Sequence, residues 1–393
     1  MKRGVLVIAL LLGLFILLDG CRKEVHEVPI SQEEPVEETM KPFYLYWDAY
    51  SPEERREDFE TGFLWGLSFL GAELPASTAH EIFEWQGNRM TFHYEKAGFS
   101  EQAQEVLESF IRYIQGRREY QHRGGMDAGR FLMLTLNSSW HYYKLVEMPN
   151  RQKAFQANYN FREKEAGIVE SAVSHKSRLI QMTSVMENSH AMAFVSKEIS
   201  DTANPNSILE FEVMDVMKNG QLRFGIYGVS GILITAADPV FSAAGKPAKC
   251  LWCHELNVME PFSAVTHYRD YLSPDDFREE VDSFQTALDR YRAGLETAID
   301  YSNKQDHTFM ELLYLSFEEP SAYRLAQEWG MTEQEVKNKL AGLTSHKHGE
   351  FPQLGDVYSR KDVDPLAPFP ATPVPESSRE FSAYEPNWPV DEP

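Results

Sequence analysis

Cysteine is scarce in this chain. Only three cysteines, Cys21, Cys250 and Cys253, occur among its 393 residues. Small secreted domains that are held together by disulfides carry several cysteine pairs, and this sequence offers no such framework. With 42% hydrophobic residues, the chain is long enough to bury a core without covalent staples.

Basic residues are also under-represented. The 38 lysines and arginines are outnumbered by 60 acidic residues, which gives a formal net charge of -22. So acidic a chain repels phosphate backbones, which argues against nucleic-acid binding, and it is suited to docking onto a basic partner protein. The sequence likewise contains no P-loop, no dinucleotide-binding fingerprint and no Ser/His/Asp signature.

Long apolar runs are missing except at the N-terminus. There, Lys2 and Arg3 precede an apolar run over residues 5–18. This run is shorter than the roughly 20 residues that span a bilayer. A charged segment followed by a short apolar one is typical of a secretory signal, so we predict that the chain is exported.

The segment Leu18-Asp19-Gly20-Cys21 follows the apolar run and resembles a bacterial lipobox. The resemblance implies removal of residues 1–20 as a signal peptide and acylation of Cys21, the first residue of the mature protein. Asp19 departs from the small or apolar residue usual at its position, and an uncleaved anchor helix is the alternative. Either outcome tethers the protein to the inner or outer bacterial membrane, in the periplasm or at the cell surface.

The rest of the chain is predicted to be an α+β protein with a simple order of regions. Residues 21–42 are rich in Glu and Pro and read as a disordered acidic tether. The regions expected after it are a helical region over 43–150, an antiparallel β region over 151–270, a helical region over 271–345 and an extended Pro-rich tail over 346–393.

Helix starts are indicated by capping residues followed by apolar periodicity. Ser51, Pro52 and Glu54 form a capping box with proline at the first helical position. A second helix is predicted to start at Ser100, and a long one to cover 273–299, because apolar residues recur there every three or four positions. Shorter helices are expected at 307–317, 321–329 and 332–343.

The middle of the chain changes to a period of two. Apolar residues alternate over 209–214 and again over 222–226, and Asn219-Gly220 lies between these runs. Asn-Gly between two alternating runs is a strong hairpin signal, because both residues tolerate positive φ. A third strand is expected at 231–235. The small antiparallel sheet is placed within 155–237, with a further strand pair within 169–195.

A loop after this sheet leads to Cys250-Leu251-Trp252-Cys253-His254. This spacing is typical of c-type haem attachment. The two thiols add to the two vinyl groups of one porphyrin, and the adjacent imidazole of His254 becomes the proximal iron ligand. The motif therefore predicts one covalent haem c per chain, with Trp252 packed on the macrocycle or shielding its edge.

The motif resembles that of c-type cytochromes over these five residues. In a chain with 3 cysteines and 12 histidines it is not expected by chance, and it agrees with the export signal. The order of sheet, loop and motif is similar to the beta-type cytochrome c-prime family, in which the haem motif also follows an antiparallel sheet. That family is shorter and ends soon after the motif, whereas this chain continues to residue 393.

The second iron ligand is left open by the sequence. Met310 is a candidate distal ligand, His267 and His307 are alternatives, and the iron can also be five-coordinate. For any single Met or His, packing in the core is the ordinary role. The haem propionates have candidate partners in Lys246 and Lys249.

A zinc site is the main rival of the haem. It would use the two cysteines of the motif and His254, with a further histidine as the fourth ligand. The candidates for that fourth ligand are His267, His346 and His348. A redox-active cysteine pair is less well supported, because no thioredoxin-like βαβ pattern surrounds the motif.

Three functions follow from these patterns. The first is an exported, lipid-anchored monohaem protein that transfers electrons as its iron cycles between ferrous and ferric states. The second is a haem enzyme or gas sensor with an open distal site. The third is a non-haem surface lipoprotein, either structural or zinc-binding.

Overall fold

The computed structural model describes residues 41–171, 173–174, 176–185, 189–201, 203–255, 258, 264–266 and 270–375. The predicted signal peptide, Cys21, nearly all of the predicted tether and His267 lie outside the described residues. From Pro42 onward the chain forms one compact unit. No helix in the described ranges combines the length and the apolar character needed to cross a membrane.

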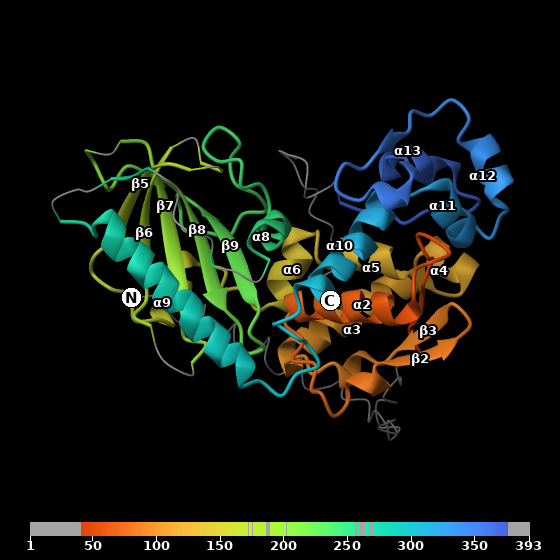
Figure 1. Ribbon diagram of the computed structural model, residues 1–393, viewed down its shortest axis with the longest axis horizontal. Helices are drawn as coiled ribbons and strands as arrows, with labels where there is room; N and C mark the ends of the chain where they lie inside the picture. The colour runs from red at the N-terminus through yellow and green to blue at the C-terminus, as the bar shows by residue number, and fades with distance from the viewer. Residues whose placement is uncertain are drawn as a thin grey trace, which may run out of the picture. The chain divides into compact units, whose positions relative to one another are not determined.

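The protein has the predicted α+β class, and its N-terminal region is mainly helical (Figure 1). The helices are α2 (Arg56–Phe69), α3 (Glu101–Gln115), α4 (Arg118–Arg123), α5 (Ala128–Thr135), α6 (Ser139–Leu145) and α7 (Gln152–Ala157). Helix α3 confirms the predicted start, since Ser100 Oγ accepts a hydrogen bond from the Ala103 amide, and it ends at Gly116.

The region over 43–150 has the predicted helices, but it also contains a small sheet that was not predicted. Its order is β2-β3-β1-β4, from β1 (Tyr44–Tyr46), β2 (Phe83–Gln86), β3 (Arg89–Phe92) and β4 (Met126–Asp127). Gly87 adopts a φ of 68° in the turn between β2 and β3. These strands are short, and β1 pairs with β3 and β4 over long sequence distances, so a pattern search within one window misses this sheet.

The helix predicted to start at Ser51 begins five residues later, at Arg56. Ser51 and Glu54 instead close a turn. The Glu53 amide donates to Ser51 Oγ at 3.2 Å, and the Tyr50 amide donates to Glu54 Oε2 at 2.7 Å. A capping-box sequence thus satisfies the backbone of a turn here, and the helix follows the turn.

The larger sheet has six strands in the order β10-β5-β6-β7-β8-β9, and all neighbours are antiparallel. The strands are β5 (Ala166–Glu170), β6 (Ser177–Met182), β7 (Ala193–Ile199), β8 (Ile208–Val216), β9 (Leu222–Gly228) and β10 (Ala264–Thr266). The predicted β8–β9 hairpin is confirmed, with Gly220 at a φ of 86°. The strand predicted at 231–235 is wrong, because Ile232 and Leu233 form only isolated bridges there.

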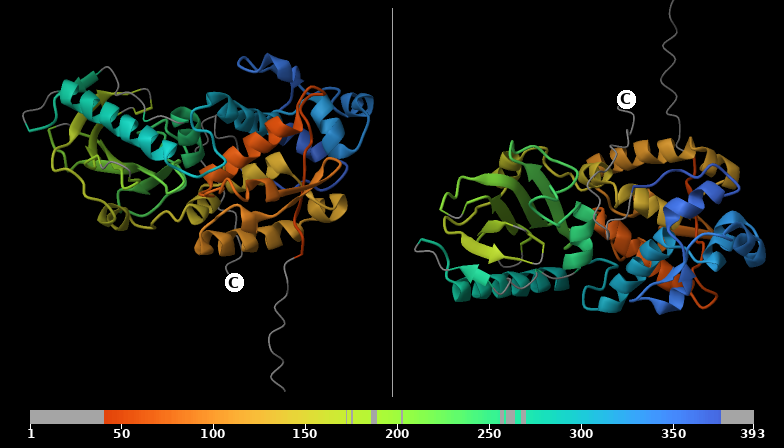
Figure 2. Two further views of the ribbon diagram at one scale, coloured as in Figure 1. Left: turned by 60° about the horizontal axis from the view of Figure 1, so that its bottom comes forward. Right: turned by 90° about the horizontal axis from the view of Figure 1, so that it is seen from above.

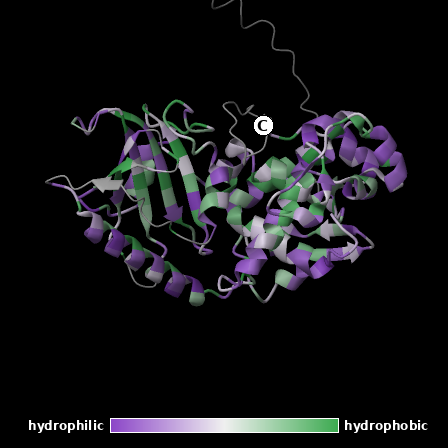
Figure 3. Cartoon of the chain, turned by 45° about the horizontal axis from the view of Figure 1, so that its top comes forward, coloured by the Kyte–Doolittle hydropathy of each residue, from purple (hydrophilic) through white to green (hydrophobic). Residues whose placement is uncertain are grey.

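One face of this sheet is covered by the long helix α9 (Pro274–Ala293), which Figure 2 shows from two sides. The rings of Phe194 on β7 and Phe284 on α9 lie 4.4 Å apart. Ser273 caps α9 as predicted, but the helix ends at Gly294 and not near residue 299. Figure 3 shows that α9 is amphipathic, with hydrophilic residues alternating with apolar ones along its length.

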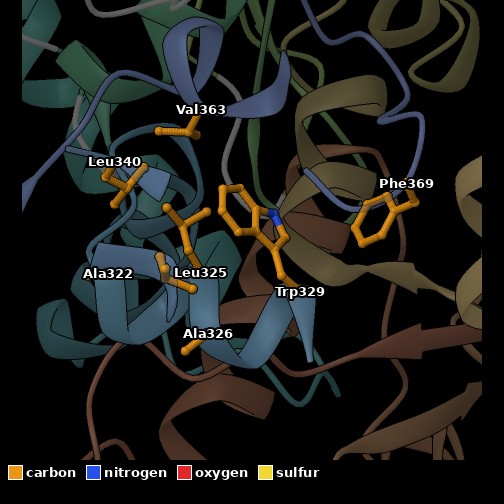
Figure 4. Packing of buried hydrophobic residues seen from close by; sticks show 8 residues of the cluster. Ala322, Leu325, Ala326, Trp329, Leu340, Val363 and Phe369 are labelled. Carbon is orange, nitrogen blue, oxygen red and sulfur yellow. The ribbon is translucent and has the colours of Figure 1, made fainter. Parts of the chain in front are cut away.

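The C-terminal region consists of α10 (Lys304–Glu318), α11 (Ala322–Trp329) and α12 (Glu333–Lys339). Figure 4 shows how residues of the predicted extended tail pack against them: Val363 and Phe369 join a buried cluster with Trp329 and Leu340. The tail contains β11 (His346–Lys347), β12 (Asp356–Val357) and α13 (Arg360–Val363). The expectation of an extended surface tail is therefore wrong for this part of it.

A buried arginine network fixes the tail to the N-terminal helices. We use this name for the carboxylates Asp48, Glu119, Asp127, Glu328 and Asp364 together with Arg123, Arg130, Arg324 and Arg360. Arg130 contacts Asp364 at 2.9 Å, and Arg324 contacts Asp127 at 2.9 Å. Because these pairs join residues about 200 positions apart, they determine how the ends of the compact unit pack.

Candidate functional site

The cysteine motif forms the last turns of the short helix α8 (Pro247–His254), which packs on β9. Pro247 occupies the first helical position. Cys250, Cys253 and His254 are spaced three and four residues apart, so they share about 100° of the helix circumference. We call this side of α8 the attachment face, and Trp252 projects from the opposite side.

The attachment face adjoins the six-stranded sheet. The His254 ring lies against Phe224 of β9, with the ring centroids 5.2 Å apart. Cys250 is partly buried, whereas Cys253 is exposed, and neither forms a disulfide. The structure therefore brings the three predicted attachment residues to one surface, with the sheet beside it.

The environment of Cys250 keeps its thiol neutral. Burial raises the pKa of Cys250 well above its usual range, and the nearby carboxylate of Glu212 raises it further. The positive charges of Arg178 and Lys249 lower the pKa of Cys250, but their effects are smaller than those of burial and Glu212. A thiol held in this way is a poor nucleophile in the folded chain, since the thiolate is the reactive form.

Trp252 joins α8 to helix α10. Its ring lies 4.6 Å from that of Tyr314 and 6.2 Å from that of His307, between ring centroids. His307 is buried, which lowers its pKa to about 4, and its Nε2 has no hydrogen-bond partner among the described residues. Met310 lies one turn further along α10 and is fully buried. His307 is thus on the Trp252 side of α8. Among the described contacts, none joins His307 or Met310 to the attachment face.

The two lysines proposed for the propionates are held by backbone carbonyls. Lys246 Nζ donates to Asn137 O at 3.3 Å, and Lys249 Nζ donates to Ala243 O at 2.8 Å. Both contacts fix the loop that leads into α8. Binding of a haem propionate by Lys246 or Lys249 stays a prediction.

The zinc alternative finds little support among the described residues. His346 lies on β11, where its Nε2 is 3.0 Å from Glu319 Oε2, and His348 follows it in the chain. No group of three metal-ligating side chains in the described ranges includes Cys250 or Cys253. The remaining candidate, His267, lies outside these ranges.

Sequence reasoning missed a group of three glutamates beside the motif. Glu198, Glu210 and Glu212 each offer a carboxylate oxygen, and these oxygens lie within 4.8 Å of one another. We call them the carboxylate cluster. The alternation along β8 places Glu210 and Glu212 on one face of the strand. It does not reveal that helices and a loop cover this face in the folded protein.

Arg178 of β6 holds two members of the carboxylate cluster. Its Nε donates to Glu198 Oε1 at 2.8 Å, and its Nη2 donates to Glu212 Oε1 at 3.0 Å. Ser242 Oγ donates to the same Glu212 oxygen at 3.0 Å. Burial, together with the charges of Glu212 and Glu198, raises the pKa of Glu210 to about 8. Glu210 therefore has an unusually high proton affinity for a carboxylate.

Comparisons were made with models of protein families, with curated proteins and with solved structures, and none of them gives a match. The function therefore has to be argued from the motif and its surroundings.

Proposed function

We propose that the protein carries one covalent haem c and transfers electrons outside the cytoplasm, anchored to the membrane by a lipid at Cys21. Cys250 and Cys253 would form the thioethers, and His254 would be the proximal iron ligand. The observation that carries this proposal is the attachment face, on which two thiols and one imidazole lie together on a single helix. When bound, the haem supplies a ferrous–ferric couple.

The donor set fits a haem better than it fits a thiolate-bound metal. Thioether formation converts both cysteines into neutral sulfurs, which suits the buried, carboxylate-flanked position of Cys250. A zinc site needs thiolates and further ligands whose donor atoms converge on one point, and in the described ranges the two cysteines and His254 do not form such a group. The chemistry of the side chains thus favours covalent haem.

The neighbouring residues have clear positioning roles in this proposal. Phe224 supports the imidazole of His254 from the sheet. Trp252 fixes α8 against Tyr314 of α10, so that the attachment face keeps its orientation. The net charge of -22 supports docking of a basic redox partner.

A second candidate function is a haem enzyme or gas sensor. It is favoured by the position of His307, which contacts Trp252 on the other side of α8 from the attachment face, and by the full burial of Met310. An iron that lacks these two ligands and also His267 would be five-coordinate and open to a small molecule. Met310 as a distal ligand stays a prediction, which the spin state of the iron tests.

The decisive experiment is expression in a host with haem-attachment machinery. We expect a sharp reduced α-band in the absorption spectrum and a haem-stained band that survives denaturing electrophoresis. Cys250→Ser together with Cys253→Ser should abolish the stained band. A colourless wild-type protein with two free thiols, or with bound zinc, would contradict the proposal.

Two variants separate the remaining parts of the proposal. Met310→Leu should leave the spectrum of the oxidised protein unchanged if the iron is five-coordinate, whereas a shift from low to high spin would identify Met310 as the distal ligand. Cys21→Ser should move the protein from the membrane fraction to the soluble fraction. Unchanged membrane association of this variant would support the uncleaved anchor helix.

A further inference from the structure

The carboxylate cluster holds more negative charge than its surroundings neutralise. Glu198 and Glu210 are almost fully buried, and Glu212 lies beside them. The guanidinium of Arg178 is the cation that contacts this cluster among the described residues. Burying unpaired carboxylates is costly, so such a site either takes up protons or binds a cation.

Each glutamate of the cluster is oriented through one of its two oxygens. Arg178 binds Glu198 Oε1, the Asp238 amide donates to Glu210 Oε2 at 3.0 Å, and Arg178 and Ser242 bind Glu212 Oε1. The other oxygens of two members, Glu198 Oε2 and Glu210 Oε1, are buried without a hydrogen-bond partner among the described residues. Outer contacts that orient a carboxylate and leave one oxygen available are typical of metal ligands.

Ser196 provides an independent observation. It lies directly opposite Glu212 in the register of β7 and β8, and two residues before Glu198 on the same strand. Opposite residues of an antiparallel pair share one face, so its hydroxyl projects on the face that carries the cluster. The side chain is 8% exposed, and its Oγ has no hydrogen-bond partner among the described residues.

We propose that Glu198, Glu210, Glu212 and Ser196 form a binding site for a hard divalent cation of the Ca²⁺, Mg²⁺ or Mn²⁺ class. All the donors are oxygens, which these cations prefer over the nitrogen and sulfur ligands chosen by zinc. The cation completes the coordination of the unpartnered oxygens and balances the excess negative charge beside Arg178.

This site does not depend on the haem. It uses none of the attachment residues, although Glu212 lies close enough to Cys250 to raise the pKa of its thiol. A bound cation would offset that carboxylate charge and would stiffen the sheet beside α8. Failure of haem attachment would therefore leave the cation site standing, and the reverse also holds.

Binding is measured on the purified full-length protein with Mn²⁺ alone, from the loss of the free-ion signal in electron paramagnetic resonance. We expect saturable binding of one Mn²⁺ per chain at pH 8, with displacement by Ca²⁺ or Mg²⁺. The thermal midpoint of unfolding should rise with Mn²⁺ concentration, since a ligand of the native state stabilises it. The absence of saturable binding in the millimolar range would overturn the proposal.

Substitutions test which residues bind the cation. Glu210→Gln should weaken Mn²⁺ binding at least about tenfold, because ligand charge determines the affinity of such sites, and Ser196→Ala should weaken it by a smaller factor. Glu105→Gln on the exposed face of α3 is the matched control and should bind as the wild type does. If Glu210→Gln fails to fold, Ser196→Ala decides the outcome. If a folded Ser196→Ala protein binds Mn²⁺ with wild-type affinity, Ser196 is not part of the site. The acidic cluster then has no independent support, and the assignment is overturned.

Discussion

The two buried ionic groups of this protein differ in their charge balance. The arginine network sets five carboxylates against four guanidinium groups, whereas the carboxylate cluster sets three carboxylates against one. In the arginine network, the pKa of Asp48 is raised to about 7 by burial, and its side chain is hydrogen-bonded to Asp127. A protonated Asp48 leaves four negative and four positive charges in that network. A protonated Glu210, whose pKa is raised to about 8, still leaves two negative charges against one positive charge in the carboxylate cluster.

This difference indicates different roles for the two groups. A balanced and largely buried set of ion pairs fixes one arrangement of the chain, here the packing of α10, α11 and α13 on α5. The ring of Phe317 lies beneath Arg130, Arg324 and Arg360, at 3.9 Å from the Arg360 guanidinium carbon. An unbalanced set remains ready to take up a positive charge. We therefore assign a structural role to the arginine network and a binding role to the carboxylate cluster.

The largest expected effect is the loss of a central carboxylate from the arginine network. Glu328 contacts Arg130, Arg324 and Arg360, and these three cations hold its pKa well below its usual range despite its burial. Removing one partner from a buried ionic group costs about 3–5 kcal/mol. Glu328→Gln should lower the free energy of unfolding by that amount, measured by urea denaturation.

The control for this prediction is an exposed pair of the same spacing. Glu333 and Lys337 form an ion pair on the surface of α12, and exposed pairs contribute little. Glu333→Gln should unfold at the same urea concentration as the wild type. Equal stability of the Glu328→Gln and Glu333→Gln proteins would contradict the structural role of the arginine network.

An intermediate effect is expected at the carboxylate cluster, and it depends on pH. The pKa of Glu210 is raised to about 8 in the folded protein. Between its unfolded value near 4.5 and pH 8, the folded state holds a proton that the unfolded state has lost, so stability falls as the pH rises. The other charged groups facing it are Glu198, Glu212 and Arg178. Glu210→Gln should remove the contribution of Glu210 to this fall in stability. The change is measured by thermal unfolding without divalent cations from pH 5 to 9.

Divalent cations provide a second test of the difference between the carboxylate cluster and the arginine network. In the wild type, Mn²⁺ competes with the proton on Glu210, so its stabilising effect should grow as the pH rises toward 8. Neither the Glu210→Gln protein nor the arginine network offers such a site. A stabilisation by Mn²⁺ that is equal in the wild type and in Glu210→Gln would place the bound ion elsewhere.

Features that depend on neighbouring residues could be predicted from the sequence. The Ser100 and Ser273 caps and the Asn219-Gly220 hairpin act within a few positions, and the structure has each of them. The motif at Cys250 also depends only on neighbouring residues, so it could be recognised from the sequence. The motif is predicted to lie in a loop, whereas the structure places it on helix α8, and the spacing then gathers the three attachment residues on one side of that helix.

Features that depend on distant contacts could not be predicted. The tail packs in the interior because Arg130 binds Asp364, and nothing near either residue indicates the other. Alternating glutamates on β8 look like a solvated face until Arg178 of β6 and Glu198 of β7 are placed beside them. Met310 lies in an apolar helical sequence whether it packs in the core or binds iron, so only the structure reveals that it is fully buried on α10.

The smallest effect at acidic pH is expected at Asp48, where the balance of the arginine network can be tested without breaking it. Arg123 donates to Asp48 Oδ2 at 2.8 Å, and the raised pKa of Asp48 means that this side chain supplies a proton to the hydrogen bond with Asp127. An asparagine keeps an acceptor for Arg123 and a donor for Asp127. Asp48→Asn should therefore match the wild type near pH 4.

Above that pH the two proteins should diverge in a defined direction. A folded pKa of about 7 for Asp48, against 3.8 when unfolded, makes wild-type stability decline between these values, and Asp48→Asn lacks that contribution. The variant should thus become the more stable of the two by pH 8, measured by urea denaturation at both pH values. A variant less stable than the wild type at pH 8 would mean that Asp48 is ionised in the fold. The arginine network would then carry a net negative charge, like the carboxylate cluster, and charge balance would no longer distinguish the two regions.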